Sequence, residues 1–336
     1  MTWGDAVSGG DSARVEAELA SGVKAVVRNG RAVVALKEDG AAVVWGDAFY
    51  GGAPDDEVRA KLQEGVVSVA SSLLGFAALK DDGSVVTWGD AATGGDSSAV
   101  AEQLKSGVVA VTATQQAFAA LKADGSVVTW GDKKGGDSSA VASLLQGGVV
   151  SITPSDNAFA ALKTDGSVVN WGHYQQYPGG IGPHNLDSPY TKLWLSGGVQ
   201  AVIPFRQAYA GLKDGGWVVT WGNVNSGGDS QAVWGQLQWD ALAVYANEDR
   251  SSQAALKTDG AVVTWGNPEN GGDSSRVKVE LQGGVKGVYA TSFAMIAVKN
   301  GRLVAWGLPS VGGDVSGAAE ELEGRISYSE RLSPER

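Results

Sequence analysis

The sequence contains no cysteine and only two histidines, His173 and His184. The absence of cysteine excludes disulfides, thiolate zinc sites, iron–sulfur clusters and cysteine nucleophiles, and it leaves the redox compartment open. No apolar run approaches the roughly 18 residues of a membrane helix, and no charged-then-apolar leader stands at the start. Neither a membrane span nor a cleaved secretion signal is therefore indicated, and the localisation stays open. The 336 residues are 43% hydrophobic, which is enough for a large buried core.

The chain is acidic, with 37 Asp and Glu residues against 26 Lys and Arg residues and a formal net charge of −11. Proteins that bind nucleic acids draw on clustered lysine and arginine, so a nucleic-acid partner is not expected. Many of the aspartates recur at fixed positions of a repeat, and this recurrence gives most of the excess charge a structural explanation. An acidic surface favours a basic protein partner, although solubility is the simpler interpretation.

The dipeptide Trp-Gly recurs at intervals of 41 to 50 residues and divides the chain into seven units. The tryptophans at this repeat position are Trp3, Trp45, Trp88, Trp130, Trp171, Trp221, Trp265 and Trp306. Repeats of roughly 40 residues are typical of solenoids, propellers and other arrays. No linker or shift in composition interrupts the array, so the sequence predicts a single domain over residues 1–336.

Each unit is predicted to contain three strands. Residues 65–89 hold a Val-rich run, an Ala-Leu segment and a second Val-rich run that ends at Trp88. The dipeptide Asp82-Gly83 separates the last two, and we expect this pair to supply the positive φ angles of a tight turn. The same turn recurs in the other units, with Asn300-Gly301 as a close substitute.

The segment between units predicts a short helix. In residues 94–107, Asp96 or Ser97 is placed to cap the first amides, and Val100 and Leu104 lie four residues apart on one face. Two further features recur. A lysine before each turn is expected to form a solvated rim with the aspartates. Aromatic residues at one register before the Ala-Leu pair are expected to pack sheet on sheet; these are Phe76, Phe118, Phe159 and Tyr209.

These features predict an all-β fold, a seven-bladed β-propeller with about three antiparallel strands per blade and a short helix connecting the blades. Both ends carry partial repeat strands, at residues 2–4 and 325–329, which would meet and close the ring. An open solenoid is the main alternative, and a piece of a longer array is another.

The units resemble the repeats of the regulator of chromosome condensation (RCC1-like) family, through segments such as AALKDDGSVVTWG (77–89) and AALKADGSVVTWG (119–131). This resemblance implies the propeller fold and, by itself, no function. In repeat length the chain looks closest to the propeller-type inhibitor of beta-lactamases. It departs from the family because the usual Gly-x-x-His before the Ala-Leu strand is missing, and no segment resembles the wedge associated with nucleotide exchange.

Function is expected where one unit differs from the others. The four tryptophans outside the repeated Trp-Gly position all fall within residues 173–245, close to the long 50-residue unit. Large amphipathic aromatics on an irregular segment are typical of binding surfaces. The candidate binding residues are His173, Tyr174, Tyr177, His184, Tyr190, Trp194 and Trp217. Trp217 is also suited to filling a local gap, and Trp234 and Trp239 are expected in a connector helix, packed between blades.

The preferred hypothesis is a non-enzymatic protein-binding scaffold that presents one propeller face, with residues 173–245 as its contact site. No catalytic residue, cofactor or metal is expected, and a small-molecule ligand stays open. One alternative is a lectin-like propeller that stacks sugars on the same aromatics. A less favoured alternative is a metal-dependent enzyme with His173, His184 and Asp187 as ligands, although their spacing fits no recognised pattern.

Overall fold

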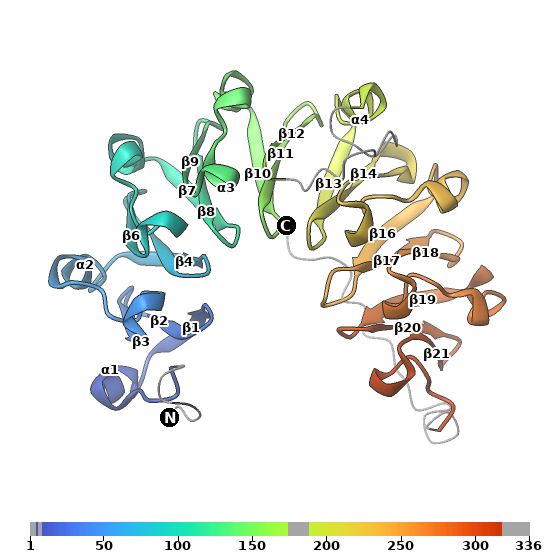
Figure 1. Cartoon of the computed structure of the whole chain (residues 1–336), viewed down its shortest axis with the longest axis horizontal. Helices are drawn as coiled ribbons and strands as arrows, with labels where there is room; N and C mark the ends of the chain where they lie inside the picture. Colours follow the sequence, from blue (N-terminus) through green and yellow to red (C-terminus); the bar gives the residue numbers. More distant parts are fainter. Residues whose placement is uncertain (1–4, 6–8, 174–187, 318–336) are drawn as a thin grey trace. The chain divides into compact units, whose positions relative to one another are not determined.

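The computed structural model describes residue 5 and residues 9–173 and 188–317. Within them the chain forms seven three-stranded antiparallel sheets, each with its strands in sequence order. The predicted all-β architecture of seven blades is confirmed. The chain divides into two compact units, Met1–His173 with blades 1 to 4 and Tyr174–Arg336 with blades 5 to 7, called unit 1 and unit 2 below (Figure 1). The terminal strands predicted at 2–4 and 325–329 lie outside the described residues, so ring closure and the single domain stay predictions.

The strands of unit 1 are β1 (Val23–Arg28), β2 (Ala32–Lys37) and β3 (Ala42–Gly46) in blade 1; β4 (Val66–Ser71), β5 (Gly75–Lys80) and β6 (Val85–Gly89) in blade 2; β7 (Val108–Ala113), β8 (Ala117–Lys122) and β9 (Val127–Gly131) in blade 3; and β10 (Val149–Pro154), β11 (Ala158–Lys163) and β12 (Val168–Gly172) in blade 4. The α-helices of this unit are α1 (Glu16–Leu19), α2 (Asp56–Lys61) and α3 (Lys133–Gly136).

The strands of unit 2 are β13 (Val199–Pro204), β14 (Ala208–Lys213) and β15 (Val218–Gly222) in blade 5; β16 (Ala241–Ala246), β17 (Ser252–Lys257) and β18 (Val262–Gly266) in blade 6; and β19 (Val285–Ala290), β20 (Ala294–Lys299) and β21 (Arg302–Gly307) in blade 7. Its α-helix is α4 (Pro189–Trp194), and 3-10 helices form most of the other connectors in both units.

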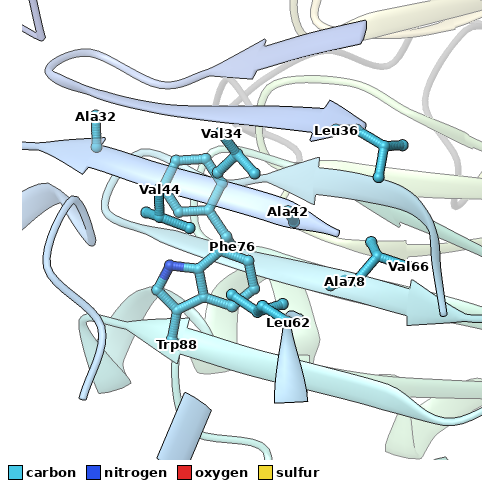
Figure 2. Packing of buried hydrophobic residues seen from close by; sticks show 10 residues of the cluster. All are labelled: Ala32, Val34, Leu36, Ala42, Val44, Leu62, Val66, Phe76, Ala78 and Trp88. Atoms are coloured by element: carbon cyan, nitrogen blue, oxygen red, sulfur yellow. The ribbon is translucent and has the colours of Figure 1, made fainter. Parts of the chain in front are cut away.

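Successive blades of a unit pack through the aromatic register predicted from the sequence. In blade 2, Phe76 on β5 pairs with Trp88 on β6, and the two rings stack with centroids 5.3 Å apart. Figure 2 shows this pair against the apolar side chains of blade 1, among them Val34 and Val44. Blades 3, 4 and 5 stack the equivalent pair of rings. Full burial of one such side chain stabilises the fold by about 1.5–3 kcal/mol, which a blade without a neighbour would forgo.

The tryptophan of Trp-Gly also ties neighbouring blades together. The indole N–H of Trp88 donates to the carbonyl of Gly51 in the preceding connector, at 3.0 Å. Equivalent bonds join Trp45 to Gly9, Trp130 to Gly94, Trp265 to Gly227 and Trp306 to Gly271. The glycine that follows is required, because Gly89 has φ +103° and a Cβ there would lie 2.4 Å from the carbonyl oxygen of Leu74.

The hairpin turn differs from its prediction in one respect. Only the glycine of Asp82-Gly83 has positive φ, at +78°, while the Asp82 carboxylate accepts the amide of Ser84 at 2.8 Å. Hydrogen bonds from the Ser84 hydroxyl and amide lower the pKa of Asp82. Both positions have positive φ in the equivalent turns Gly215-Gly216 of blade 5 and Asn300-Gly301 of blade 7. In the Asp-Gly units the expected mirror-image turn is therefore replaced by one in which the glycine alone of the pair is left-handed.

The connectors are 3-10 helices more often than α-helices. Residues Ser98–Leu104 form the 3-10 helix η5, and the Asp96 carboxylate accepts the amide of Ser98 at 2.8 Å, as predicted for a cap. Ser97 does not cap, because its hydroxyl lies 2.9 Å from that of Thr87. Leu104 is buried and anchors the helix.

The recurrent lysine has a structural role that the expectation of a solvated rim missed. The Lys122 ammonium donates to the carbonyl of Gln103, near the end of η5, at 2.8 Å. Lys80, Lys163 and Lys299 make the same bond to a carbonyl 19 residues earlier. A cation at a helix C-terminus satisfies carbonyls that lack partners within the helix. The lysine of each such unit therefore fastens its connector to its own blade.

Candidate functional site

Three of the four extra tryptophans meet in blade 5. Trp194 stacks on Trp234 with ring centroids 4.5 Å apart and an interplanar angle of 30°. Trp217 lies edge-on to both, 6.0 Å from Trp194 at 68° and 5.9 Å from Trp234 at 80°. All three side chains are half-buried. Together with Tyr190, whose ring centroid lies 6.2 Å from that of Trp194, they form what we call the tryptophan cluster.

Helix α4 supplies two members of the cluster. Its start is fixed by Ser188, whose side chain accepts the amide of Tyr190 at 3.2 Å, and by a proline at the first helical position, which suits a helix N-terminus. Tyr190 and Trp194 stand four residues apart and therefore share one helix face. Leu195, directly after the helix, is buried and anchors it in the blade, while Tyr190 keeps 62% of its surface exposed.

Trp217 and Trp234 come from the turn and the connector beside this helix. Trp217 follows the 3-10 turn Asp214–Gly216 (η7) and immediately precedes β15. Trp234 lies in the 3-10 helix Gln231–Gln236 (η9), which leads toward blade 6. The cluster is therefore built from three segments that are far apart in sequence and held by the same blade.

Lys213 lies against the cluster. Its ammonium is 5.4 Å from the centre of the Trp217 ring, and it donates to the carbonyls of Trp194 and Gly197. Burial lowers the pKa of Lys213, and the charge of Asp214 opposes that shift. The cation thus holds the end of α4 and one tryptophan together. The buried indole N–H of Trp217 has no hydrogen-bond partner among the described residues.

The repeat itself does not require these tryptophans. The position of Trp217 is Ser84, Ser126 or Ser167 in blades 2 to 4. The position of Trp234 is Ala101 or Ala142 in the corresponding connectors, and that of Trp194 is Gln103 or Leu144. Because those units form the same three-stranded sheets with small, polar or aliphatic residues there, the cluster is an addition to the blade.

The structure brings some of the predicted site residues together and not others. Tyr190, Trp194 and Trp217 come together, as grouped in the sequence, and Trp234 joins them. His173 is exposed and belongs to unit 1, where its amide donates to the carbonyl of Asn157 at 2.9 Å. Tyr174, Tyr177 and His184 lie outside the described residues, as does Asp187 of the alternative metal site. In the described part of the chain, no three His, Cys, Asp or Glu side chains are grouped to hold a metal ion.

The expectation for Trp239 was wrong. Trp239 lies after η9 rather than in a connector helix, and half of its surface is exposed. The sequence reasoning also missed that Trp234 stacks on Trp194 rather than only filling space between blades. Comparison with Ala101 and Ala142 at the same repeat position would have identified Trp234 as an addition.

No protein-family model matches this chain, and no curated protein matches it. Among solved structures, the chain is similar to the ectodomain of the receptor kinase CR4 of Physcomitrella patens, with 17% identity, a TM-score of 0.41, and coverage of 74% of this chain and 62% of that one. It is similar to yeast RCC1 (Prp20), solved bound to Kap60, with 18% identity, a TM-score of 0.41 and coverage of 72% and 70%. For the CRINKLY WD40 ectodomain of Arabidopsis thaliana ACR4 the identity is 15%, the TM-score 0.37 and the coverage 85% and 96%.

RCC1 structures are thus among the neighbours, and the seven three-stranded sheets fit RCC1-like repeats. The resemblance to the inhibitor of beta-lactamases stays a prediction. Identities of 18% or less with these structures assign no activity or partner to this chain. In the described residues, no helix combines the length and the apolar character that crossing a membrane would need.

Proposed function

We propose that this protein is a non-enzymatic binding scaffold whose tryptophan cluster contacts another protein. The observation that carries the proposal is the placement of three tryptophans at positions that other blades fill with serine, alanine or other residues. Tryptophan and tyrosine are the residue types most enriched at the energetic centres of protein interfaces. The cluster belongs to the proposed contact region 173–245, of which Tyr190, Trp194 and Trp217 carry the argument.

The shape of the cluster supports a contact surface. On α4, Tyr190 and Leu193 keep 62% and 67% of their surfaces exposed, and the Tyr190 ring lies next to the half-buried indole of Trp194. Aromatic rings that pack against each other lose little side-chain entropy when a partner binds, because they are already ordered. The contact of the Lys213 ammonium with the Trp217 ring further restrains this side chain. The cluster is therefore a pre-organised apolar surface with a tyrosine hydroxyl at its edge.

The test is affinity capture with the full chain as bait and quantitative mass spectrometry of the captured proteins. The double variant Tyr190→Ala/Trp194→Ala should reduce capture of the specific partner by about tenfold or more, the usual effect of losing a hot-spot aromatic. Phe49→Ala is the matched control, since Phe49 is 64% exposed but lies in unit 1. Circular dichroism confirms that each variant is folded. Equal capture by the wild type and the double variant would refute the assignment of the site.

A lectin-like function is the second candidate, because exposed amide side chains accompany the aromatics. Gln236 and Gln238 follow Trp234 and are exposed. Side-chain amides can pair with sugar hydroxyls while an aromatic ring stacks on the sugar face. A glycan array separates the two functions. Binding to immobilised glycans without any protein partner, lost in Tyr190→Ala/Trp194→Ala, would replace the protein partner with a carbohydrate.

A further inference from the structure

The start of β16 in blade 6 breaks a rule that the other described blades obey. The residue before the first strand is glycine in each of them, with φ between +70° and +76°; these are Gly22, Gly65, Gly107, Gly148, Gly198 and Gly284. Blade 6 has Asp240 there, at φ +64°. An aspartate in this left-handed region is less favourable than glycine, and such residues concentrate at functional sites.

The residue before Asp240 is equally exceptional. Trp239 replaces a residue that is Ser106 in blade 3 and glycine in blades 4, 5 and 7, and half of its surface is exposed. The Lys257 ammonium lies 5.8 Å from the centre of its ring. Leu242, three residues later, is 53% exposed. An indole and a carboxylate are thus presented together where the other described blades have no such pair, beside an apolar position that is also exposed in blades 2 to 4, as Val67, Val109 and Val150.

The backbone holds this segment next to the tryptophan cluster. The amide of Asp240 donates to the carbonyl of Gly215 at 3.0 Å, in the turn that precedes Trp217. The carbonyl of Asp240 accepts the amide of Thr258 at 2.9 Å. The exposed carboxylate makes no hydrogen bond or ion pair within the described part of the chain. Its position is therefore fixed while its charge is left available.

We propose that Trp239 and Asp240 form a subsite for an arginine side chain of a partner protein. This inference rests on the proposed function and names the chemistry of the partner. A planar guanidinium stacks on an indole and pairs with a carboxylate through two parallel hydrogen bonds. Lys257 occupies one face of the ring, and the arginine takes the other. The net charge of −11 attracts a basic segment over longer range, and Leu242 offers contact to an apolar neighbour of the arginine.

The test begins with selection of phage-displayed 12-residue peptides on the full chain. Enriched peptides are synthesised with arginine and with citrulline, which keeps the shape of the side chain and removes its charge. Fluorescence anisotropy then measures binding to the wild type and to Asp240→Asn, which removes the charge and tolerates positive φ. Replacing arginine by citrulline in the peptide should raise the Kd for the wild type about tenfold. The same replacement should raise the Kd for Asp240→Asn less than about twofold, because the carboxylate that pairs with the guanidinium is gone. Trp239→Ala should weaken binding of the arginine peptide about tenfold.

Two controls separate this subsite from general effects. Asp259→Asn removes one charge from the neighbouring turn of the same blade, where the Asp259 carboxylate accepts the amide of Ala261, and should leave peptide binding unchanged. Asp240→Gly restores the residue of the other blades. It should bind the arginine peptide as weakly as Asp240→Asn does, with a Tm equal to that of the wild type or up to about 3 °C higher. A Tm in this range would show that Asp240→Gly loses binding without unfolding.

Several outcomes would overturn the arginine subsite. Absence of arginine from the enriched peptides, or an equal effect of citrulline on the wild type and Asp240→Asn, overturns the subsite. So does binding of glycans alone, or association of the chain with a second copy through Trp239. If Tyr190→Ala/Trp194→Ala weakens binding while Asp240→Asn does not, the proposed function stands and the arginine subsite fails. If Asp240→Asn weakens binding while Tyr190→Ala/Trp194→Ala does not, the arginine subsite stands and the tryptophan cluster is not the contact site.

Discussion

Replacing Trp130 and Trp171 by phenylalanine provides a matched test of the hydrogen bond that joins blades. The two tryptophans occupy the same position in blades 3 and 4, and their surfaces are 5% and 4% exposed. Each stacks on a phenylalanine, with Phe118 5.3 Å and Phe159 5.1 Å from its ring centroid. They differ in one respect. The indole N–H of Trp130 donates to Gly94 at 3.0 Å, while that of Trp171 has no partner among the described residues.

The length of one connector explains the difference. Between Trp-Gly and the next pair of glycines, the connector after blade 3 is one residue shorter than the connector after blade 2. The shorter connector forms the α-helical turn α3, whereas the longer one forms the 3-10 helix Ala91–Thr93 (η4) and presents the carbonyl of Gly94 to Trp130. The deletion therefore removes the acceptor that Trp171 would otherwise use.

Both substitutions remove the same atoms, so the packing loss is expected to be similar. Trp130→Phe also breaks a hydrogen bond and leaves the carbonyl of Gly94 unpaired, whereas Trp171→Phe removes a buried donor that had no partner. We expect Trp130→Phe to lower the free energy of unfolding by about 1–2 kcal/mol more than Trp171→Phe. Urea denaturation followed by circular dichroism measures both values, and equal m-values license the comparison. Equal destabilisation by the two substitutions would refute the reasoning.

Three further predictions concern charge and packing. Hydrogen bonds from the hydroxyl and amide of Ser126 lower the pKa of Asp124 below the ordinary value of 3.8. The ionised carboxylate therefore stabilises the folded state fully at a pH above 3.8, and this stabilisation is lost as the pH falls through the lowered pKa. The urea midpoint should therefore be flat between about pH 7 and pH 5 and decline in acid, less steeply in Ser126→Ala. Lys122→Met should lower the free energy of unfolding by about 0.5–1 kcal/mol in the same assay, because it removes a connector cap. The third prediction concerns Trp265, whose ring contacts Phe205 of blade 5, while Gln253 occupies the position that holds a phenylalanine in blades 2 to 4. In the same urea assay, Phe205→Ser should lower the free energy of unfolding by about 3–5 kcal/mol and Gln253→Phe by about 1–3 kcal/mol. The double variant should lose at least about 2 kcal/mol less than the sum of the two, and simple additivity would show that the two sites are not coupled.

The strands were predictable because each unit carries its own local information. The Val-rich segments have high strand propensity, and Asp82-Gly83 marks the turn between β5 and β6. The aromatic register was also predictable, since Phe76 and Trp88 face the same side of paired strands. Sequence spacing alone therefore determined the order of strands and the packing face within each blade.

The remaining features depend on contacts between segments that are distant in sequence. Lys122 reaches a carbonyl 19 residues earlier, and the stack of Trp194 on Trp234 joins two connectors on either side of blade 5. Spacing does not reveal such contacts, because the path of the connector decides which groups meet. The strained aspartate is different. Alignment of Asp240 with the glycines of the other units would have revealed it from the sequence, although its φ angle required the structure.

Two further exceptions to the repeat lie where blades 5 and 6 meet. Gln253 occupies the position of Phe76 and is fully buried, and its side-chain oxygen has no hydrogen-bond partner among the described residues. Trp265 of the same blade instead receives an aromatic partner from blade 5, since Phe205 lies edge-on to it with centroids 6.4 Å apart. Phe205 stands where blade 2 has Ser72. Trp265 therefore has its aromatic partner in blade 5, where the tryptophans of blades 2 to 5 have theirs in their own sheet. The tryptophan cluster and Asp240 lie at the same junction, so the residues that depart from the repeat are concentrated where blades 5 and 6 contact each other.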